Sequence, residues 1–235
     1  IKTRRKIFRE TDISICARPK EGAEICQIMT SHAIYLPKSA AAIAETMASL
    51  KVRTAKMFVH STYEVSPGKY DFSSVDTILN ASAARGVDTI LLPRVVKEGS
   101  NKPISDLEAF YRDLFALASH LKGKVFGYEI GNEVDLWMGW PPNSDPREYS
   151  MLLRTAYNAV KSADPSALVM TAGFNCVSYV GFMNDFVDLN KGNFYDVFAF
   201  HFYDFLTSAN YKEDMAALMN KNTKCNSAPV TTQSS

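Results

Sequence analysis

The sequence lacks an excess of charge of either sign. It contains 26 lysine and arginine residues against 25 aspartate and glutamate residues. A chain so balanced has no summed field that would draw it to nucleic acid or to an anionic membrane. We therefore expect neither as a partner and favour a neutral or weakly charged ligand.

Long apolar runs are also missing. The basic segment at residues 2–9 is not followed by an apolar stretch of signal-peptide or membrane-span length, so the sequence as given predicts no targeting segment. A processed secreted protein would have the same appearance. Localisation therefore stays open, with secretion favoured.

Cysteine is scarce and scattered, at positions 16, 26, 176 and 225. These residues form no Cys-x-x-Cys pair and have no histidine at metal-ligand spacing, which argues against a zinc site. A disulfide between Cys16 and Cys26, or between Cys176 and Cys225, is open, because spacing alone does not decide it. We expect no metal and no organic cofactor.

What the chain does contain is an alternation of short β-rich runs with amphipathic helical stretches. Seven runs have the pattern of strands, at residues 24–30, 52–59, 87–93, 124–131, 167–173, 195–202 and 228–232. Helices are predicted between them, at residues 39–50, 73–84, 105–121, 146–163, 181–189 and 210–220. This alternation is typical of a parallel α/β fold.

Two α/β folds fit such a series, the (β/α)8 TIM barrel and the open doubly wound sheet. The sequence has neither glycine-rich phosphate loop, Gly-x-Gly-x-x-Gly after the first strand or Gly-x-x-x-x-Gly-Lys-Ser/Thr, so we favour the barrel. The same absence disfavours a barrel enzyme that acts on a phosphorylated metabolite. We expect a single domain over residues 1–235, with residues 1–23 as an N-terminal extension.

The segment "GYEIGNEVD", residues 127–135, places two glutamates at the end of the fourth predicted strand. In an extended strand, which rises about 3.3 Å per residue, Glu129 and Glu133 would share one face with about 13 Å between them. The carboxyl groups of a retaining glycosidase lie about 5 Å apart, and those of an inverting enzyme up to about 9.5 Å. These two glutamates are therefore not predicted to be each other's catalytic partner.

Different roles are predicted for the two glutamates. Barrel enzymes keep their active sites at the C-terminal ends of the strands, which makes Glu133 a candidate general acid. The alternative for Glu133 is a carboxylate that caps the next helix or holds a loop. Glu129 lies deeper, where a buried carboxylate needs a partner, and Arg53 or Lys56 on the second strand could supply one.

Three stretches resemble the fourth to sixth strands of clan A glycoside hydrolases: "YEIGNEVDLW", "REYSMLLRTAYNAVKSADPSALVMTAGF" and "YDVFAFHFYD". The earlier "HSTYEVSPGKYDFSSVDTILNASAARGVDTILLP" is similar to the second and third units of the branch that contains β-xylosidases, α-iduronidases and cellulase-like enzymes. The likeness covers about residues 24–232. It implies a (β/α)8 barrel and retaining hydrolysis of β-linked glycosides or oligosaccharides.

The resemblance also implies roles for individual residues. Glu133 would be the general acid/base and Asn132 would bind the sugar 2-hydroxyl. His201 and Tyr203 match the His-x-Tyr that closes the sixth strand near the nucleophile. His60 lies where the loop after the second strand meets substrate, which is a looser correspondence.

Both tryptophans follow the proposed acid closely, in "DLWMGWPP". The flat faces of Trp137 and Trp140 could stack on sugar rings and so bind substrate. Anchoring of the loop is the alternative for each of them.

The resemblance fails at the seventh strand, where the clan places its nucleophilic glutamate. The stretch here is "APVTTQSS", and Gln233 stands at the nucleophile position although it is not a carboxylate. An amide cannot form the covalent glycosyl ester of the retaining reaction. Two hypotheses follow: an active glycosidase whose true nucleophile is replaced at 233 or lies beyond Ser235, and a catalytically impaired protein that binds carbohydrate without cleaving it.

The eighth βα unit of the barrel is also missing from the sequence. We expect the barrel to be incomplete at its C-terminal part, and a missing segment or a second chain to complete it.

Overall fold

The computed structural model describes residues 27–29, 39–97, 100, 102–136, 138–175, 180–201 and scattered positions between 209 and 220. Five strands form one parallel sheet, in the order β1 (Gln27–Met29), β2 (Thr54–Val59), β5 (Asp88–Pro93), β6 (Gly127–Glu129) and β7 (Leu168–Met170). Bridges from Met170 to Val197 and from Phe174 to Phe200 continue the parallel pairing beyond β7. The predicted parallel α/β fold is confirmed.

The order of the strands bears on which α/β fold this is. Each parallel strand pairs with the parallel strand that follows it in the sequence. In a doubly wound sheet, by contrast, the order of the strands reverses part-way across the sheet. The described sheet therefore grows in one direction only, as the strands of a barrel do. The predicted strand at 228–232, most of the predicted helix at 210–220, and residues 1–23 lie outside the described residues.

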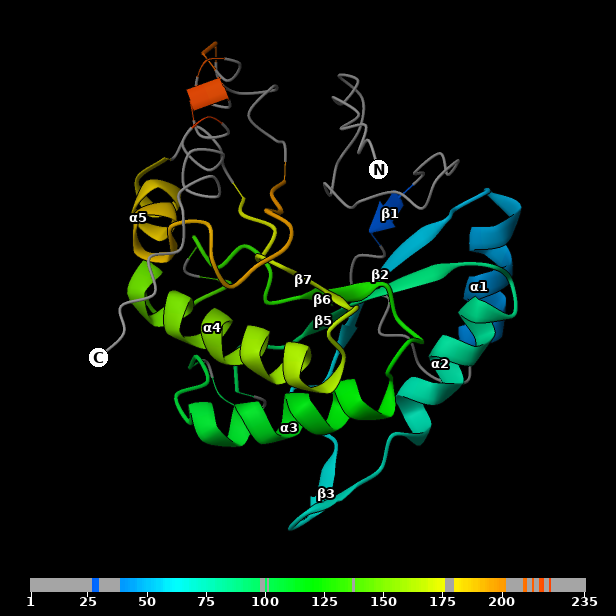
Figure 1. Ribbon diagram of the computed structural model, residues 1–235. Helices are drawn as coiled ribbons and strands as arrows, with labels where there is room; N and C mark the ends of the chain where they lie inside the picture. The colour runs from blue at the N-terminus through cyan, green and yellow to red at the C-terminus, as the bar shows by residue number, and fades with distance from the viewer. Residues whose placement is uncertain are drawn as a thin grey trace.

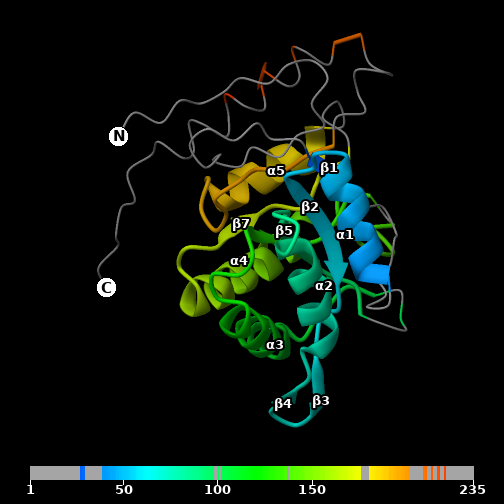
Figure 2. The same ribbon diagram turned by 90° about the vertical axis from the view of Figure 1, so that its right-hand side faces the viewer.

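The described part of the chain has five helices beside the sheet: α1 (Ala40–Ser49), α2 (Ser73–Ala83), α3 (Leu107–His120), α4 (Pro146–Ala163) and α5 (Val180–Asn190). They follow one another around the sheet, from α1 and α2 at one edge through α3 and α4 to α5 (Figures 1 and 2). None of these described helices is long and apolar enough to cross a membrane.

Aspartates begin two of the helices. Asp106 accepts a hydrogen bond from the Ala109 amide at the start of α3, and Asp145 accepts one from the Arg147 amide at the start of α4. Such caps satisfy backbone N–H groups that have no partner inside the helix. The two capped helices then pack side by side beneath the sheet (Figure 1).

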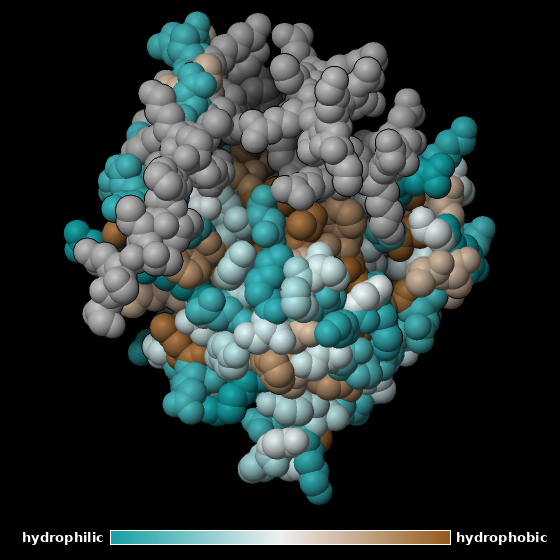
Figure 3. All heavy atoms as spheres, viewed as in Figure 1, coloured by the Kyte–Doolittle hydropathy of each residue, from teal (hydrophilic) through white to brown (hydrophobic). Residues whose placement is uncertain are grey.

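A small antiparallel hairpin, β3 (Glu64–Ser66) with β4 (Lys69–Tyr70), follows β2. It projects away from the parallel sheet (Figure 2) and is fixed at its base by a hydrogen bond from the Tyr70 hydroxyl to Asp113 of α3. On the face shown in Figure 3, hydrophilic residues cover much of the lower half, and hydrophobic ones gather toward the upper middle.

An aromatic cluster fills the space between α4, α5 and the end of β7, and Tyr149 lies at its centre. The hydroxyl of Tyr149 donates to the carbonyl of Ile130 at 2.9 Å and accepts from the amide of Ala172 at 2.6 Å. One buried side chain of α4 therefore ties together the segments that leave β6 and β7. These two segments carry the candidate site.

Replacing Tyr149 with phenylalanine is expected to destabilise the fold while keeping the ring. The substitution leaves the buried Ile130 carbonyl and Ala172 amide without their partner, and each orphaned group costs about 1–3 kcal/mol. Chemical denaturation measures the loss in the free energy of unfolding.

Tyr157→Phe is the matched control for this prediction, because the half-buried Tyr157 hydroxyl forms no hydrogen bond to a described residue. Equal losses in the two variants would contradict the bridging role of Tyr149.

Candidate active site

The Gly131-Asn132-Glu133 motif directly follows β6, where the chain turns sharply. Gly131 and Glu133 have φ angles of 90° and 49°, and the second value is uncommon for a residue with a side chain. The turn is held against the segment after β7, because the Glu133 amide donates to the Gly173 carbonyl at 3.1 Å. The prediction of an extended strand through Glu133 is therefore wrong, so the estimate of about 13 Å, which assumed an extended strand, does not apply.

Glu133 lies against His201. The His201 Nδ1 and Glu133 Oε1 atoms are 2.6 Å apart, and the two side chains are 3% and 20% exposed. His201 is fixed in turn by its backbone amide, which donates to the Phe174 carbonyl at 2.7 Å. The structure thus brings together two predicted site residues from the ends of the fourth and sixth parallel segments.

The hydrogen bond from His201 is the main cause that lowers the pKa of Glu133 below its ordinary value of 4.5. Burial acts in the opposite direction, and the side chain of Asn175 and the charge of His201 each lower the pKa further. Glu133 is consequently held as a carboxylate, because its neighbours stabilise the charged form more than partial burial disfavours it.

Glu129 is fully buried below this pair, at the end of β6. Its Oε2 atom lies 2.7 Å from the Lys56 ammonium of β2, which confirms the predicted structural partnership between the two residues. Its Oε1 atom has no hydrogen-bond donor among the described residues. Glu129 thus presents a charged oxygen toward the interior of the site.

Gly173 borders both of these pairs. A Cβ atom on Gly173 would lie 2.5 Å from His201 Nε2 and 3.2 Å from Glu129 Oε1. His201 and Glu129 therefore both lie next to Gly173.

Asn175 and Gly173 are site residues that the sequence analysis missed. The side chain of Asn175 forms a hydrogen bond with Glu133. The backbone amide of Asn175 donates to both carboxylate oxygens of the buried Asp135, at 2.9 and 3.0 Å. The available signal was their position, since Gly173 ends the fifth predicted strand and Asn175 follows it, so both reach the same edge of the sheet as Glu133.

Asn132 and His60 differ in their surroundings. Asn132 pairs with Gly173 through an isolated bridge, and its buried Oδ1 atom has no hydrogen-bond partner within the described part of the chain. His60 is exposed directly after β2 and packs edge-on against Tyr63, with ring centroids 5.7 Å apart. Both residues follow C-terminal ends of parallel strands.

The prediction that Trp140 stacks on a sugar is wrong for this structure. Its indole is 2% exposed, and Nε1 donates to Glu148 at 3.0 Å while the ring packs edge-on against Tyr149. Trp140 therefore anchors the loop, because neither face of its ring is open to a ligand. Trp137, Tyr203 and Gln233 lie outside the described residues.

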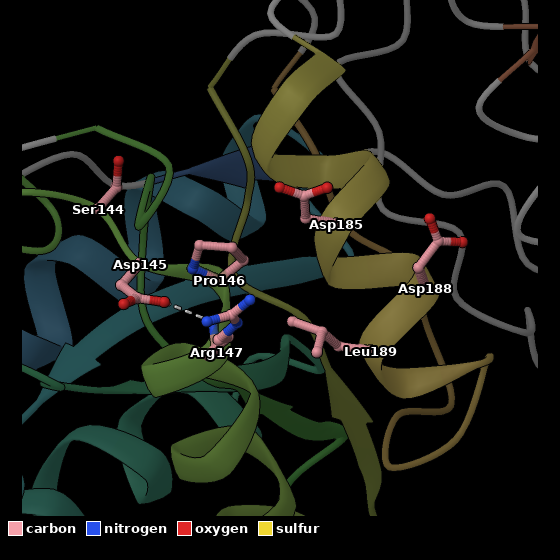
Figure 4. Close-up of a pocket in the computed structure, with 7 residues that line it drawn as sticks. All are labelled: Ser144, Asp145, Pro146, Arg147, Asp185, Asp188 and Leu189. Atoms are coloured by element: carbon pink, nitrogen blue, oxygen red, sulfur yellow. Dashed lines mark hydrogen bonds between the residues drawn. The ribbon is translucent and has the colours of Figure 1, made fainter.

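A cavity of about 540 Å³ lies between the start of α4 and the exposed side of α5. In Figure 4, Asp185 and Asp188 lie on α5, and Asp145 and Arg147 lie at the start of α4. None of the predicted site residues that the structure describes is among the residues that line this cavity. Among the residues that the structure describes, no group of three or more histidine, cysteine, aspartate or glutamate side chains is arranged to hold a metal ion.

Several solved structures have a similar fold. A family 39 glycoside hydrolase from Bacteroides cellulosilyticus WH2 superposes with a TM-score of 0.60 at 16% identity, over 74% of this chain and 37% of that one. A glucosidase from Croceicoccus marinus gives 0.65 at 15% identity, over 78% and 45%. A monomeric β-xylosidase from Caulobacter crescentus CB15 gives 0.53 at 21% identity, over 69% and 38%.

The likeness is one of fold. At these identities a shared architecture does not carry over an activity, and the chain spans less than half the length of each of the three proteins. No protein-family model matches the sequence, and no curated protein matches it either.

The lowered pKa of Glu133 makes a prediction about stability against acid. Because the folded-state pKa lies below the unfolded one, the stabilisation is complete above the unfolded value and is lost as the pH falls through the folded value. Denaturation curves between pH 7 and pH 3 should therefore show a steeper loss in the wild type than in Glu133→Gln.

Glu108→Gln serves as the control for that comparison, since its carboxylate is 88% exposed on α3. It should keep the wild-type slope. A slope in Glu133→Gln identical to that of the wild type would refute the lowered pKa.

Proposed function

We propose that the chain is part of a glycoside hydrolase that cleaves β-linked glycosides with retention, and that Glu133 is its general acid/base. The observation that carries the proposal is the 2.6 Å contact between Glu133 and His201. It joins a carboxyl group to an imidazole at the sheet edge where parallel α/β enzymes place their chemistry. The Asn-Glu motif and the shared fold support the same assignment.

The Glu133–His201 pair is the proposed proton carrier. As the general acid, Glu133 has to carry a proton when the substrate reacts, although the hydrogen bond from His201 favours its carboxylate form. In the first step a second carboxylate attacks the anomeric carbon, the glycosidic C–O bond breaks with its electron pair on the leaving oxygen, and that oxygen takes the proton from Glu133. In the second step water attacks the anomeric carbon, the bond to the second carboxylate breaks with its electron pair on that carboxylate, and Glu133 takes a proton from the water.

The covalent intermediate requires a second carboxylate. Gln233 occupies the position that the resemblance assigns to the nucleophile, and its amide cannot form the glycosyl ester. In the active protein that we propose, a carboxylate replaces Gln233 or lies outside residues 1–235.

Substrate is proposed to bind across the edge formed by the C-terminal ends of the strands. Asn132 would present Oδ1 to the sugar 2-hydroxyl, because this atom has no partner among the described residues. His60, Trp137 and Tyr203 would complete the subsite. A neutral sugar agrees with the balanced charge of the chain.

A specific observation favours a second candidate function, a protein that binds carbohydrate without cleaving it. A general acid works best with a raised pKa, whereas the neighbours of Glu133 lower its pKa. Together with Gln233, this supports the proposal of a glycosidase-like protein that binds carbohydrate and does not cleave it.

Hydrolysis of aryl β-xylosides and β-glucosides tests the two candidates. In an active protein, Glu133→Gln is expected to lower kcat by about 10²–10⁴-fold on nitrophenyl substrates. The loss should be smaller on dinitrophenyl substrates, because a better leaving group depends less on protonation.

The same assay has outcomes that contradict the proposal. Glu108→Gln should retain full activity, since that side chain is exposed on α3. Sugar binding by calorimetry without turnover would favour the second candidate. Unchanged turnover in Glu133→Gln would remove Glu133 from the mechanism.

A further inference from the structure

The imidazole of His201 lies where a side chain on residue 173 would project. A Cβ atom at Gly173 would be 2.5 Å from His201 Nε2 and 2.9 Å from its Cδ2, closer than carbon atoms approach such groups. The backbone of Gly173 is outside the left-handed region, whereas Gly131 and Gly68 have φ angles of 90° and 73°. What requires a glycine at 173 is therefore the neighbouring ring rather than the backbone conformation.

The ring has little freedom to move away. His201 is 3% exposed, and its amide is bound to the carbonyl of Phe174, the residue next to Gly173. Its Nδ1 atom is committed to Glu133 on the opposite side. Displacement of the ring would consequently change its distance from Glu133.

Gly173 also touches the other members of the site. Its carbonyl accepts the hydrogen bond from the Glu133 amide, which holds the left-handed turn of the acid. A Cβ atom on Gly173 would also lie 3.2 Å from Glu129 Oε1. Glu129 is paired in turn with the ammonium group of Lys56. One residue thus contacts the backbone of Glu133, the ring that binds Glu133 and the buried ion pair beneath that ring.

We propose that Gly173 is a positioning residue, whose missing side chain leaves the socket in which His201 sits against Glu133, with the Glu129–Lys56 pair as the floor of that socket. The catalytic consequence of this assignment rests on the proposed function. The geometric part does not, because it concerns only how the imidazole and the carboxylate are held together.

The experiment is a carbon-13 NMR titration of the glutamate carboxyl groups in the whole chain, with Glu133 assigned from Glu133→Gln. Besides His201, the Asn175 side chain lowers the pKa of Glu133. The adjoining segments also carry Asp135, which accepts from the Asn175 backbone amide, and the Glu129–Lys56 pair. None of these groups is altered in the variants. In Gly173→Ala the midpoint of Glu133 should shift upward, because the displaced ring no longer stabilises the carboxylate.

Gly181→Ala is the matched control, since a Cβ there meets nothing within 4 Å and its backbone is equally ordinary. It should leave the midpoint of Glu133 unchanged. An unchanged midpoint in Gly173→Ala would overturn the proposal.

A double-mutant cycle separates the socket from a general loss of packing. In a His201→Ala background the ring is absent, so Gly173→Ala should shift the midpoint of Glu133 no further. Where Gly173→Ala alone fails to fold, the double variant should recover folding, as measured by circular dichroism. Failure of both variants would mean that the backbone itself demands glycine, which would overturn the proposal.

Kinetics gives a readout that also separates this proposal from the proposed function. In a wild type that turns over aryl glycosides, Gly173→Ala should lower kcat by about 10²-fold with a smaller change in KM, as misplacement of a reacting group does. A wild type without turnover would count against the glycosidase alone. The NMR titration would still decide whether Gly173 positions His201.

Discussion

The contact between Glu133 and His201 is the interaction on which the candidate site depends. It joins two segments of the sheet that are separated by 68 residues in the sequence and by β7 in space. It also explains the state of the acid, because an imidazole at this distance lowers the pKa of Glu133. A site built on one such contact is sensitive to anything that moves either partner.

The surrounding structure consists of supports for that contact. Tyr149 of α4 holds the segments after β6 and β7 together, and Gly173 leaves room for the imidazole between them. The Glu129–Lys56 pair buries opposite charges below, which satisfies both more fully than either would be satisfied alone. The helices and the core therefore act on the site through a few defined atoms.

Local signals were enough to predict most of the fold. The bounds of α4 were predicted at 146–163 and are found there, because Asp145-Pro146 and Asp164-Pro165 mark both ends in the sequence itself. A charged partner for Glu129 was predicted from its burial, with Arg53 and Lys56 as the candidates, and Lys56 is the one found there. The bounds of α4 could be predicted because helix end signals are local, and the ion pair could be predicted because a buried carboxylate needs a positively charged partner.

The details of the site depended on tertiary contacts that no local pattern encodes. The strand was expected to continue through Glu133, but its turn is fixed by the carbonyl of Gly173 on the next segment. The side chain of Trp140 was open to two interpretations until Glu148 and Tyr149 were seen to enclose it. The sequence identifies the residues of the site, but their backbone conformation and exposure depend on neighbours that are distant in the sequence.

The left-handed backbone of Glu133 has a consequence for how this position can vary. Conformations of this kind cost a residue with a long side chain on the order of 1–3 kcal/mol, and asparagine, aspartate or glycine would adopt them at lower cost. Those shorter residues would relax the turn but would not extend as far as the imidazole. Selection for thermal robustness and selection for chemistry would therefore favour different amino acids at this position, and the glutamate found here reaches the imidazole at a cost in stability.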